Sequence, residues 1–133
     1  MKVKNIRSQE LVIGGWQSGK GRRANKIGSL LVGYNEGKGA MRRLRYAGKV
    51  GTGFTDEVLR YLAEQLKPLQ QHESPFAGRQ PPRDAVFVEP RLVAEIEFNE
   101  WTSAGTLRHP SFKGLRDDKD AAEVIREQPA APR

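Results

Sequence analysis

Cysteine is absent from the chain, and its absence excludes several classes of protein at once. A disulfide framework, a thiolate zinc site, an iron–sulfur cluster and a cysteine nucleophile all require the missing residue. Histidine is scarce as well, because the chain has only His72 and His109, and these two lie without metal-ligand spacing. We therefore expect no metal site in this chain.

Long apolar runs are missing too. The apolar stretches span only a few residues, far short of the roughly 20 needed to cross a bilayer. Residues 1–7, MKVKNIR, have no apolar core of the kind found in signal peptides. We expect a soluble, cytoplasmic protein with no membrane partner, and a chain of 133 residues is long enough to bury its own core as a single domain.

Positive charge is in excess and unevenly distributed. The chain has 23 lysines and arginines against 16 aspartates and glutamates, a formal net charge of +7. Residues 1–49 hold 12 of the basic residues and only two acidic ones, Glu10 and Glu36. A concentrated positive field raises the local concentration of a polyanion such as nucleic acid. A solvated, solubilising surface is the alternative that charge alone leaves open.

Hydrophobic alternation predicts five short strands. They lie at about residues 10–13, 27–34, 41–50, 92–101 and 112–115. The third strand carries apolar side chains on one face, Leu44, Tyr46 and Val50, and cations on the other, Arg43, Arg45 and Lys49. The fourth strand is apolar on the face of Ala94, Ile96 and Phe98 and polar on the face of Glu95, Glu97 and Asn99. The third strand is thus predicted to be half core and half polyanion surface.

One helix is predicted between the third and fourth strands. Thr55 is placed as its N-cap, and two acidic residues follow in the first turn, where they favour the helix dipole. An apolar stripe at helical spacing is expected to face the core, and Pro68 ends the helix. The stripe consists of Val58, Leu59, Leu62, Ala63 and Leu66.

The remaining segments complete the predicted architecture. Residues 70–83, with three prolines, read as a long loop, residues 120–128 as a terminal helix, and residues 128–133 as a flexible tail. Three strands, a helix and two strands follow the connectivity of the OB-fold, a small, partly open barrel. We therefore predict a mainly β protein, a five-stranded OB-fold barrel with a helix between strands 3 and 4 and a short C-terminal helix, occupying residues 1–127.

No complete active site is visible in the sequence alone. Residues 14–21 match a phosphate-binding loop in part, but Gly21 stands where a magnesium-binding Ser or Thr belongs, so a flexible cationic loop is the better interpretation. The adjacent Asp117 and Asp118 are more typical of a solvated turn or helix cap than of a magnesium site. Some aromatic residues would offer stacking platforms for bases, although most are expected in the core. They are Trp16, Tyr34, Tyr46, Phe54 and Trp101.

Three segments carry a resemblance to a known family. They are residues 11–16 (LVIGGW), 44–54 (LRYAGKVGTGF) and 108–119 (RHPSFKGLRDDK). Together they resemble the C-terminal OB-fold domain of ATP-dependent DNA ligases, closest to the ligase portion of the bacterial end-joining enzymes. The last segment is similar to the final signature motif of the ligases, in which an Arg-x-Asp-Lys cluster closes over the nucleotide.

The resemblance implies roles for particular residues. Arg116, Asp118 and Lys119 would close onto the adenylation domain and orient the pyrophosphate leaving group of ATP while the enzyme is adenylylated. Lys2 and Lys4 resemble the end of the preceding motif, whose lysines contact the α-phosphate. The Lys-x-Asp-Gly motif that accepts AMP is missing from this sequence. The chain alone is therefore not expected to form a ligase-adenylate, and ATP and Mg²⁺ are expected only in the context of a complete ligase.

The resemblance also implies partners. The chain is expected to be a bacterial, nucleoid-associated monomer that grips nicked duplex DNA and meets an adenylation domain, in cis or in trans, in DNA repair and recombination by end joining. Its phosphate contacts would come from Lys20, Arg22, Arg23, Lys26, Arg42, Arg43, Arg45 and Lys49. An independent OB-fold protein that binds single-stranded nucleic acid without ligase activity is the alternative.

Overall fold

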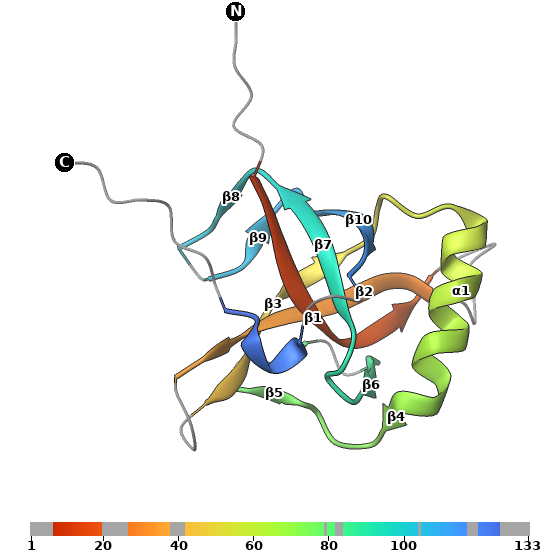
Figure 1. Ribbon diagram of the computed structural model, residues 1–133, viewed down its shortest axis with the longest axis horizontal. Helices are drawn as coiled ribbons and strands as arrows, with labels where there is room; N and C mark the ends of the chain where they lie inside the picture. The colour runs from red at the N-terminus through yellow and green to blue at the C-terminus, as the bar shows by residue number, and fades with distance from the viewer. Residues whose placement is uncertain are drawn as a thin grey trace, which may run out of the picture.

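A computed structural model describes residues 7–19, 27–37, 42–78, 80–81, 84–103, 105–116 and 120–125. Strands dominate this part of the chain, and a single α-helix accompanies them (Figure 1). The elements in chain order are β1 (Arg7–Ser18), β2 (Ile27–Glu36), β3 (Arg43–Val50), α1 (Asp56–Leu66), the 3₁₀-helix η3 (Lys67–Leu69), β4 (Gln70–Gln71), β5 (Phe76–Ala77), β6 (Val86–Val88), β7 (Val93–Phe98), β8 (Glu100–Trp101), β9 (Leu107–Arg108), β10 (Ser111–Leu115) and the 3₁₀-helix η4 (Ala121–Glu123).

The main sheet follows the order β10-β7-β1-β2-β3-β5. β1 is shared between two neighbours, because its first half pairs with β7 and its second half pairs with β2. The sheet curls strongly, as Figure 1 shows, and the Phe112 amide of β10 donates to the Thr52 carbonyl beyond β3 at 2.9 Å. This curled, half-barrel arrangement, with α1 after the third strand, is consistent with the predicted OB-fold.

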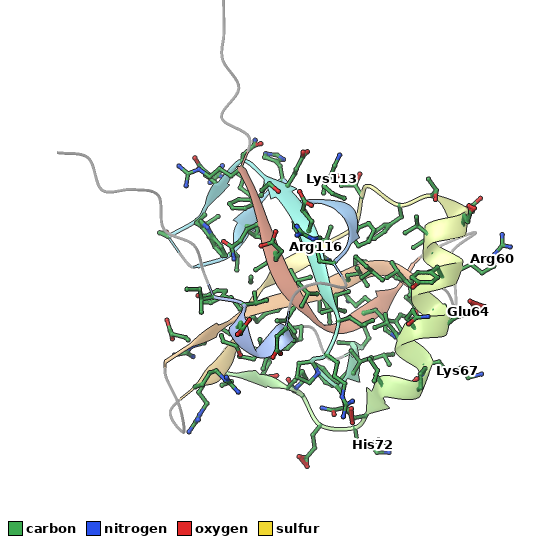
Figure 2. The ribbon with its side chains drawn as sticks, in the orientation of Figure 1. Arg60, Glu64, Lys67, His72, Lys113 and Arg116 are labelled. Atoms are coloured by element: carbon green, nitrogen blue, oxygen red, sulfur yellow. The ribbon has the colours of Figure 1, made fainter. Side chains whose placement is uncertain are left out.

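The helix confirms its predicted N-cap and the three leucines of its predicted stripe, whereas Ala63 is exposed and Val58 is half-buried. Thr55 Oγ1 accepts a hydrogen bond from the Val58 amide at 3.1 Å and so caps the first turn. Leu59, Leu62 and Leu66 are buried against the sheet. The polar side chains Arg60 and Glu64 of α1 and Lys67 of η3 point away from the barrel (Figure 2). The predicted alternation of the fourth strand is also confirmed, since Ala94, Ile96 and Phe98 are all buried in β7.

The predicted loop at residues 14–21 is wrong over its first five residues. Residues 14–18 continue β1, where Gly15 pairs with Leu31 on one side and with Phe87 on the other. A side chain has no room there, because a Cβ at Gly15 would lie 2.7 Å from the Val86 carbonyl oxygen. The glycines therefore serve close strand packing and a β-bulge rather than a phosphate loop.

The predicted long loop at residues 70–83 is also wrong in part. It contains β4 and β5, and β5 pairs with β3 in parallel. Phe76 anchors this segment, since it is only 4% exposed and its ring lies where Gly14 and Gly33 leave space. The strands β6 and β9 were not predicted either, and the predicted strand at residues 92–101 is divided into β7 and β8.

The predicted C-terminal helix is shorter than expected. Within residues 120–125 it is a single 3₁₀ turn, η4, and Ile125 then forms a parallel bridge with Asn35 of β2. Val124 is buried, so packing against the barrel replaces further helical turns. The rest of that prediction, and the tail at residues 128–133, fall outside the described residues.

Candidate functional site

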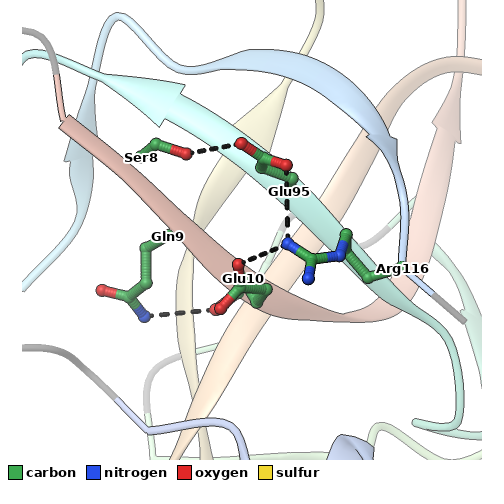
Figure 3. Close-up of polar contacts among 5 residues, drawn as sticks. All are labelled: Ser8, Gln9, Glu10, Glu95 and Arg116. Atoms are coloured by element: carbon green, nitrogen blue, oxygen red, sulfur yellow. Dashed lines mark hydrogen bonds and ion pairs between the residues drawn. The ribbon is translucent and has the colours of Figure 1, made fainter. Parts of the chain in front are cut away.

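Two glutamates face each other at the centre of the barrel wall. Glu10 of β1 and Glu95 of β7 are direct partners in the antiparallel ladder. Like charges at such positions repel each other and destabilise a sheet unless a cation lies between them. Arg116 supplies that cation, since its Nη1 lies 2.9 Å from Glu10 Oε2 and 3.6 Å from Glu95 Oε1 (Figure 3). Ser8 Oγ also donates to Glu95 Oε2 at 2.8 Å.

The backbone holds Arg116 at the end of β10. Its amide donates to the Val93 carbonyl at 2.8 Å and so continues the ladder between β10 and β7. The Arg116 side chain is 32% exposed, while those of Glu10 and Glu95 are 18% and 36% exposed. The guanidinium is therefore held by carboxylates on one side and is partly accessible to solvent.

The segment that follows the predicted signature motif is docked on β1 and β2. Asn35 makes three contacts with it, because its amide donates to the Val124 carbonyl at 2.8 Å and its Nδ2 donates to the carbonyls of Ala121 and Val124 at 2.8 and 2.9 Å. Gln9 Nε2 donates to the Ile125 carbonyl at 2.8 Å. Residues 120–125 are thereby held in place from two strands.

The cationic face predicted for the third strand is divided by a bulge. Arg43 and Arg45 pair with Glu36 and Tyr34 of β2, but the register shifts by one residue between Val32 and Gly33. A one-residue shift moves every later side chain to the opposite face. Lys49 therefore shares its face with Leu44 rather than with the two arginines, and the predicted common face is wrong beyond Tyr46.

Arg45 differs from Arg42 and Arg43 in its ion pair with Glu36 and in its lower exposure. Arg45 Nε lies 2.8 Å from Glu36 Oε1, and this hydrogen bond, together with the charge of Glu36, raises the pKa of the Arg45 guanidinium. Arg42 and Arg43 are exposed, and Arg43 Nη1 donates to the Arg42 carbonyl at 3.0 Å. Arg43 is thus the more exposed of these two arginines of β3.

A surface hollow of about 480 Å³ lies between the docked C-terminal segment and the start of β3. Arg42 lines it together with Asn35, Asp120 and Arg91. Arg91 was not among the cations singled out from the sequence, and its Nε lies 2.8 Å from Glu89 Oε2. Arg42 therefore lies beside residues 120 and 121 of the docked segment, and Lys49 does not line the same hollow.

Four of the five aromatic candidates pack against other aromatic rings. Tyr34 meets Trp101 edge-on with ring centroids 5.5 Å apart, and Tyr46 meets Phe76 at 5.3 Å. Phe54 packs on Phe112 at 5.2 Å. These rings belong to the core or its margin, as expected from the sequence for most of them.

Several predicted site residues lie outside the described part of the chain. They are Lys2, Lys4, Lys20, Arg22, Arg23, Lys26, Asp118 and Lys119. Among the residues that the structure does describe, acidic and histidine side chains form no cluster of three that would hold a metal ion. Within the same residues, no helix is both long and apolar enough to span a membrane.

Sequence reasoning missed the residues that anchor Arg116. Glu10 lies in a predicted strand and is one of only two acidic residues among the first 49, which was a usable signal. Its pairing with Glu95 depends on the register of two strands about 85 residues apart in the sequence. Asn35 lies just beyond the predicted strand at residues 27–34, whereas in the structure it is a strand residue that holds the C-terminal segment.

The curled sheet, with one α-helix after β3 in the described part of the chain, is consistent with an OB-fold domain. The chain belongs to the family described as ATP dependent DNA ligase C terminal region, whose model matches residues 23–119. That range contains Arg116 and the arginines of β3, whereas Glu10 lies before it. The resemblance predicted from the three sequence segments is confirmed.

Relatives and solved structures agree with this assignment. The multifunctional non-homologous end joining DNA repair protein LigD of Mycobacterium tuberculosis is 48% identical over 130 residues, which are 96% of this chain and 17% of that protein. The ligase domain of M. tuberculosis LigD superposes with a TM-score of 0.83 at 46% identity, over 93% of this chain and 40% of that one. A mycobacterial DNA ligase D complexed with ATP and MES gives a TM-score of 0.76 at 44% identity, over 91% and 38%. The chain is thus a C-terminal ligase domain of the LigD type and spans well under half of these proteins.

Proposed function

We propose that this chain grips nicked duplex DNA for an ATP-dependent ligase and supplies Arg116 to the adenylylation of the ligase lysine. The observation that carries the proposal is the position of Arg116 in a domain of this family. Its backbone is fixed to β7 and its guanidinium, partly open to solvent, is fixed to two carboxylates. An arginine held in this way is available to a partner surface that approaches the end of β10.

The chemistry of phosphoryl transfer makes such a residue useful. Catalysis of this kind depends mainly on positioning and on cations that face developing negative charge. When bound by a complete ligase, ATP supplies the adenylyl group, and Arg116 would orient the departing pyrophosphate with Asp118 and Lys119. Lys2 and Lys4 would face the α-phosphate.

The fit of this chain to the nucleotide is partial. Arg116 has the charge and the partial exposure that a phosphate contact requires. The described residues offer no cluster of ligands for Mg²⁺, so the metal and most nucleotide contacts would come from the adenylation domain. ATP dependence is therefore proposed for the complete ligase, with this chain as one of its parts.

DNA contact is proposed for the basic residues of the first part of the chain. Arg43 and Arg42 are the best placed of the described candidates because they are exposed and lie next to each other. Arg45 would contribute less, since Glu36 already neutralises it. The further contacts would come from Lys20, Arg22, Arg23, Lys26 and Lys49. Such contacts to phosphate are tolerant of sequence and sensitive to salt.

The alternative, an independent binder of single strands, would need exposed aromatic platforms. Tyr34 is buried, Tyr46, Phe54 and Trp101 are half-buried in ring contacts within the domain, and Trp16 is half-buried against the core. This packing favours the duplex-gripping ligase domain over the single-strand binder.

A chimera tests the catalytic part of the proposal. This chain replaces the corresponding C-terminal part of the M. tuberculosis LigD ligase domain, and transfer of labelled AMP from ATP to the protein is followed. We expect adenylylation in the chimera and a loss of at least about tenfold in rate with Arg116→Ala, while binding to nicked DNA is unchanged. An unchanged rate in the variant, or a chimera that is never adenylylated, would contradict the proposed role.

A further inference from the structure

We propose that Glu10 is a positioning residue that sets the direction of the Arg116 guanidinium. This inference rests on the proposed function, because it concerns how Arg116 reaches the pyrophosphate. It adds a residue of β1, far from the signature segment in sequence, to the machinery of adenylylation. Glu95 supports Glu10 in this role from the neighbouring strand.

Distance and burial show which of the two carboxylates holds Arg116 more tightly. Glu10 lies 2.9 Å from Arg116 Nη1 and is 18% exposed, whereas Glu95 lies 3.6 Å away and is 36% exposed. Glu95 also accepts a hydrogen bond from Ser8 Oγ, which occupies its other oxygen. The shorter and more buried contact is the one less weakened by solvent, so Glu10 is the principal anchor.

Glu10 and its neighbour Gln9 contact residues that precede and follow residues 117–119 in the sequence. Gln9, its neighbour in β1, is only 2% exposed and donates to the carbonyls of Glu10 and Ile125 at 3.2 and 2.8 Å. Glu10 therefore holds the arginine at the end of β10, while Gln9 holds the segment that follows. Two adjacent residues of one strand thus fix Arg116 and residues 120–125 relative to each other.

Stability alone is a poor reason for this arrangement. Two carboxylates that face each other across a ladder repel, and a partly buried ion pair gives little net stability compared with an apolar pair of similar size. A geometric role explains the pair better. The two carboxylates restrict the guanidinium to the space between them. The guanidinium therefore loses less conformational freedom when it contacts a phosphate.

The LigD chimera described above also tests this inference, with single-turnover adenylylation as the readout. We expect Glu10→Gln to slow adenylylation about tenfold, because a misplaced catalytic group loses rate steeply with distance. Glu10→Asp keeps the charge and should recover part of that rate. The matched control is Glu97→Gln, on the same strand as Glu95, which removes a carboxylate that lies 3.7 Å from Lys113 Nζ. That control should adenylylate at the parent rate.

A double-mutant cycle separates positioning from a general loss of structure. If Glu10 acts through Arg116, Glu10→Gln has no further effect once Arg116→Ala is present. If the rate losses of Glu10→Gln and Arg116→Ala multiply in the double variant, the positioning role is overturned while the role of Arg116 stands. Equal rates for Glu10→Gln and Glu97→Gln would overturn it in the same way. An unchanged rate for Arg116→Ala itself would overturn the proposed function instead. Thermal unfolding is measured for each variant alongside its rate. If Glu10→Gln does not fold, Glu10→Asp takes its place in the same cycle.

Discussion

Asn35→Ala should release the C-terminal segment from the barrel without unfolding the domain. The substitution removes two side-chain hydrogen bonds, from Nδ2 to the carbonyls of Ala121 and Val124. The backbone bond from Asn35 to Val124 remains. Each neutral bond contributes roughly 1 kcal/mol net, so docking should weaken by about 2 kcal/mol, which is about 30-fold in the population of the released state.

Hydrogen exchange measures this release directly. The amides of Glu123 and Val124 donate to the carbonyls of Asp120 and Ala121, at the two ends of η4, and are expected to exchange about 30-fold faster in the variant. Amides of the central strand β7 should keep their protection. Gln80→Ala is the matched control, because Gln80 Nε2 also donates to two backbone carbonyls, those of Phe76 and Gly78, away from the segment. Unchanged exchange at Glu123 and Val124, or an equal increase throughout β7, would refute the reasoning.

Three further substitutions test other parts of the domain. Phe76→Ala should lower the free energy of unfolding by about 3–5 kcal/mol in a denaturant titration, because a buried ring leaves a cavity over two glycines; a loss below about 1 kcal/mol would contradict that packing. Thr55→Ala should cost about 1 kcal/mol by removing the cap of α1, and no change in the same titration would show that the cap is unimportant. Arg43→Ala should reduce the slope of log affinity for DNA against log salt by about one, whereas Arg60→Ala, on the outer side of α1, should not; equal slopes in both would remove Arg43 from the interface.

The fold was largely predictable because its signals are local. The alternation of Ala94, Ile96 and Phe98 and the cap at Thr55 each follow from neighbours in the sequence, and all were confirmed. The glycines of β1 were misread, because glycine is typical both of loops and of strands that another chain segment approaches closely. Only the long-range approach of Val86 and Phe76 decides between the two interpretations.

The candidate site was predictable in part for the same reason. Arg116 could be found from a motif within a short stretch of sequence, and the structure places it at the end of β10. Its partner Glu10 depends on strand register, which the sequence pattern leaves undetermined. The bulge in β3 is a similar case: one extra residue, Ala47, separates Lys49 from Arg43 and Arg45, and simple alternation does not predict it.

Fluorescence anisotropy of the full chain tests whether it is the DNA-gripping domain of a ligase. Nicked duplex, intact duplex and single strand of equal length are titrated at several salt concentrations. We expect tighter binding to duplex than to single strand, with affinity falling about a thousandfold between roughly 50 and 200 mM salt if about six phosphates are neutralised. Preference for the single strand, or an affinity that does not change with salt, would contradict this expectation.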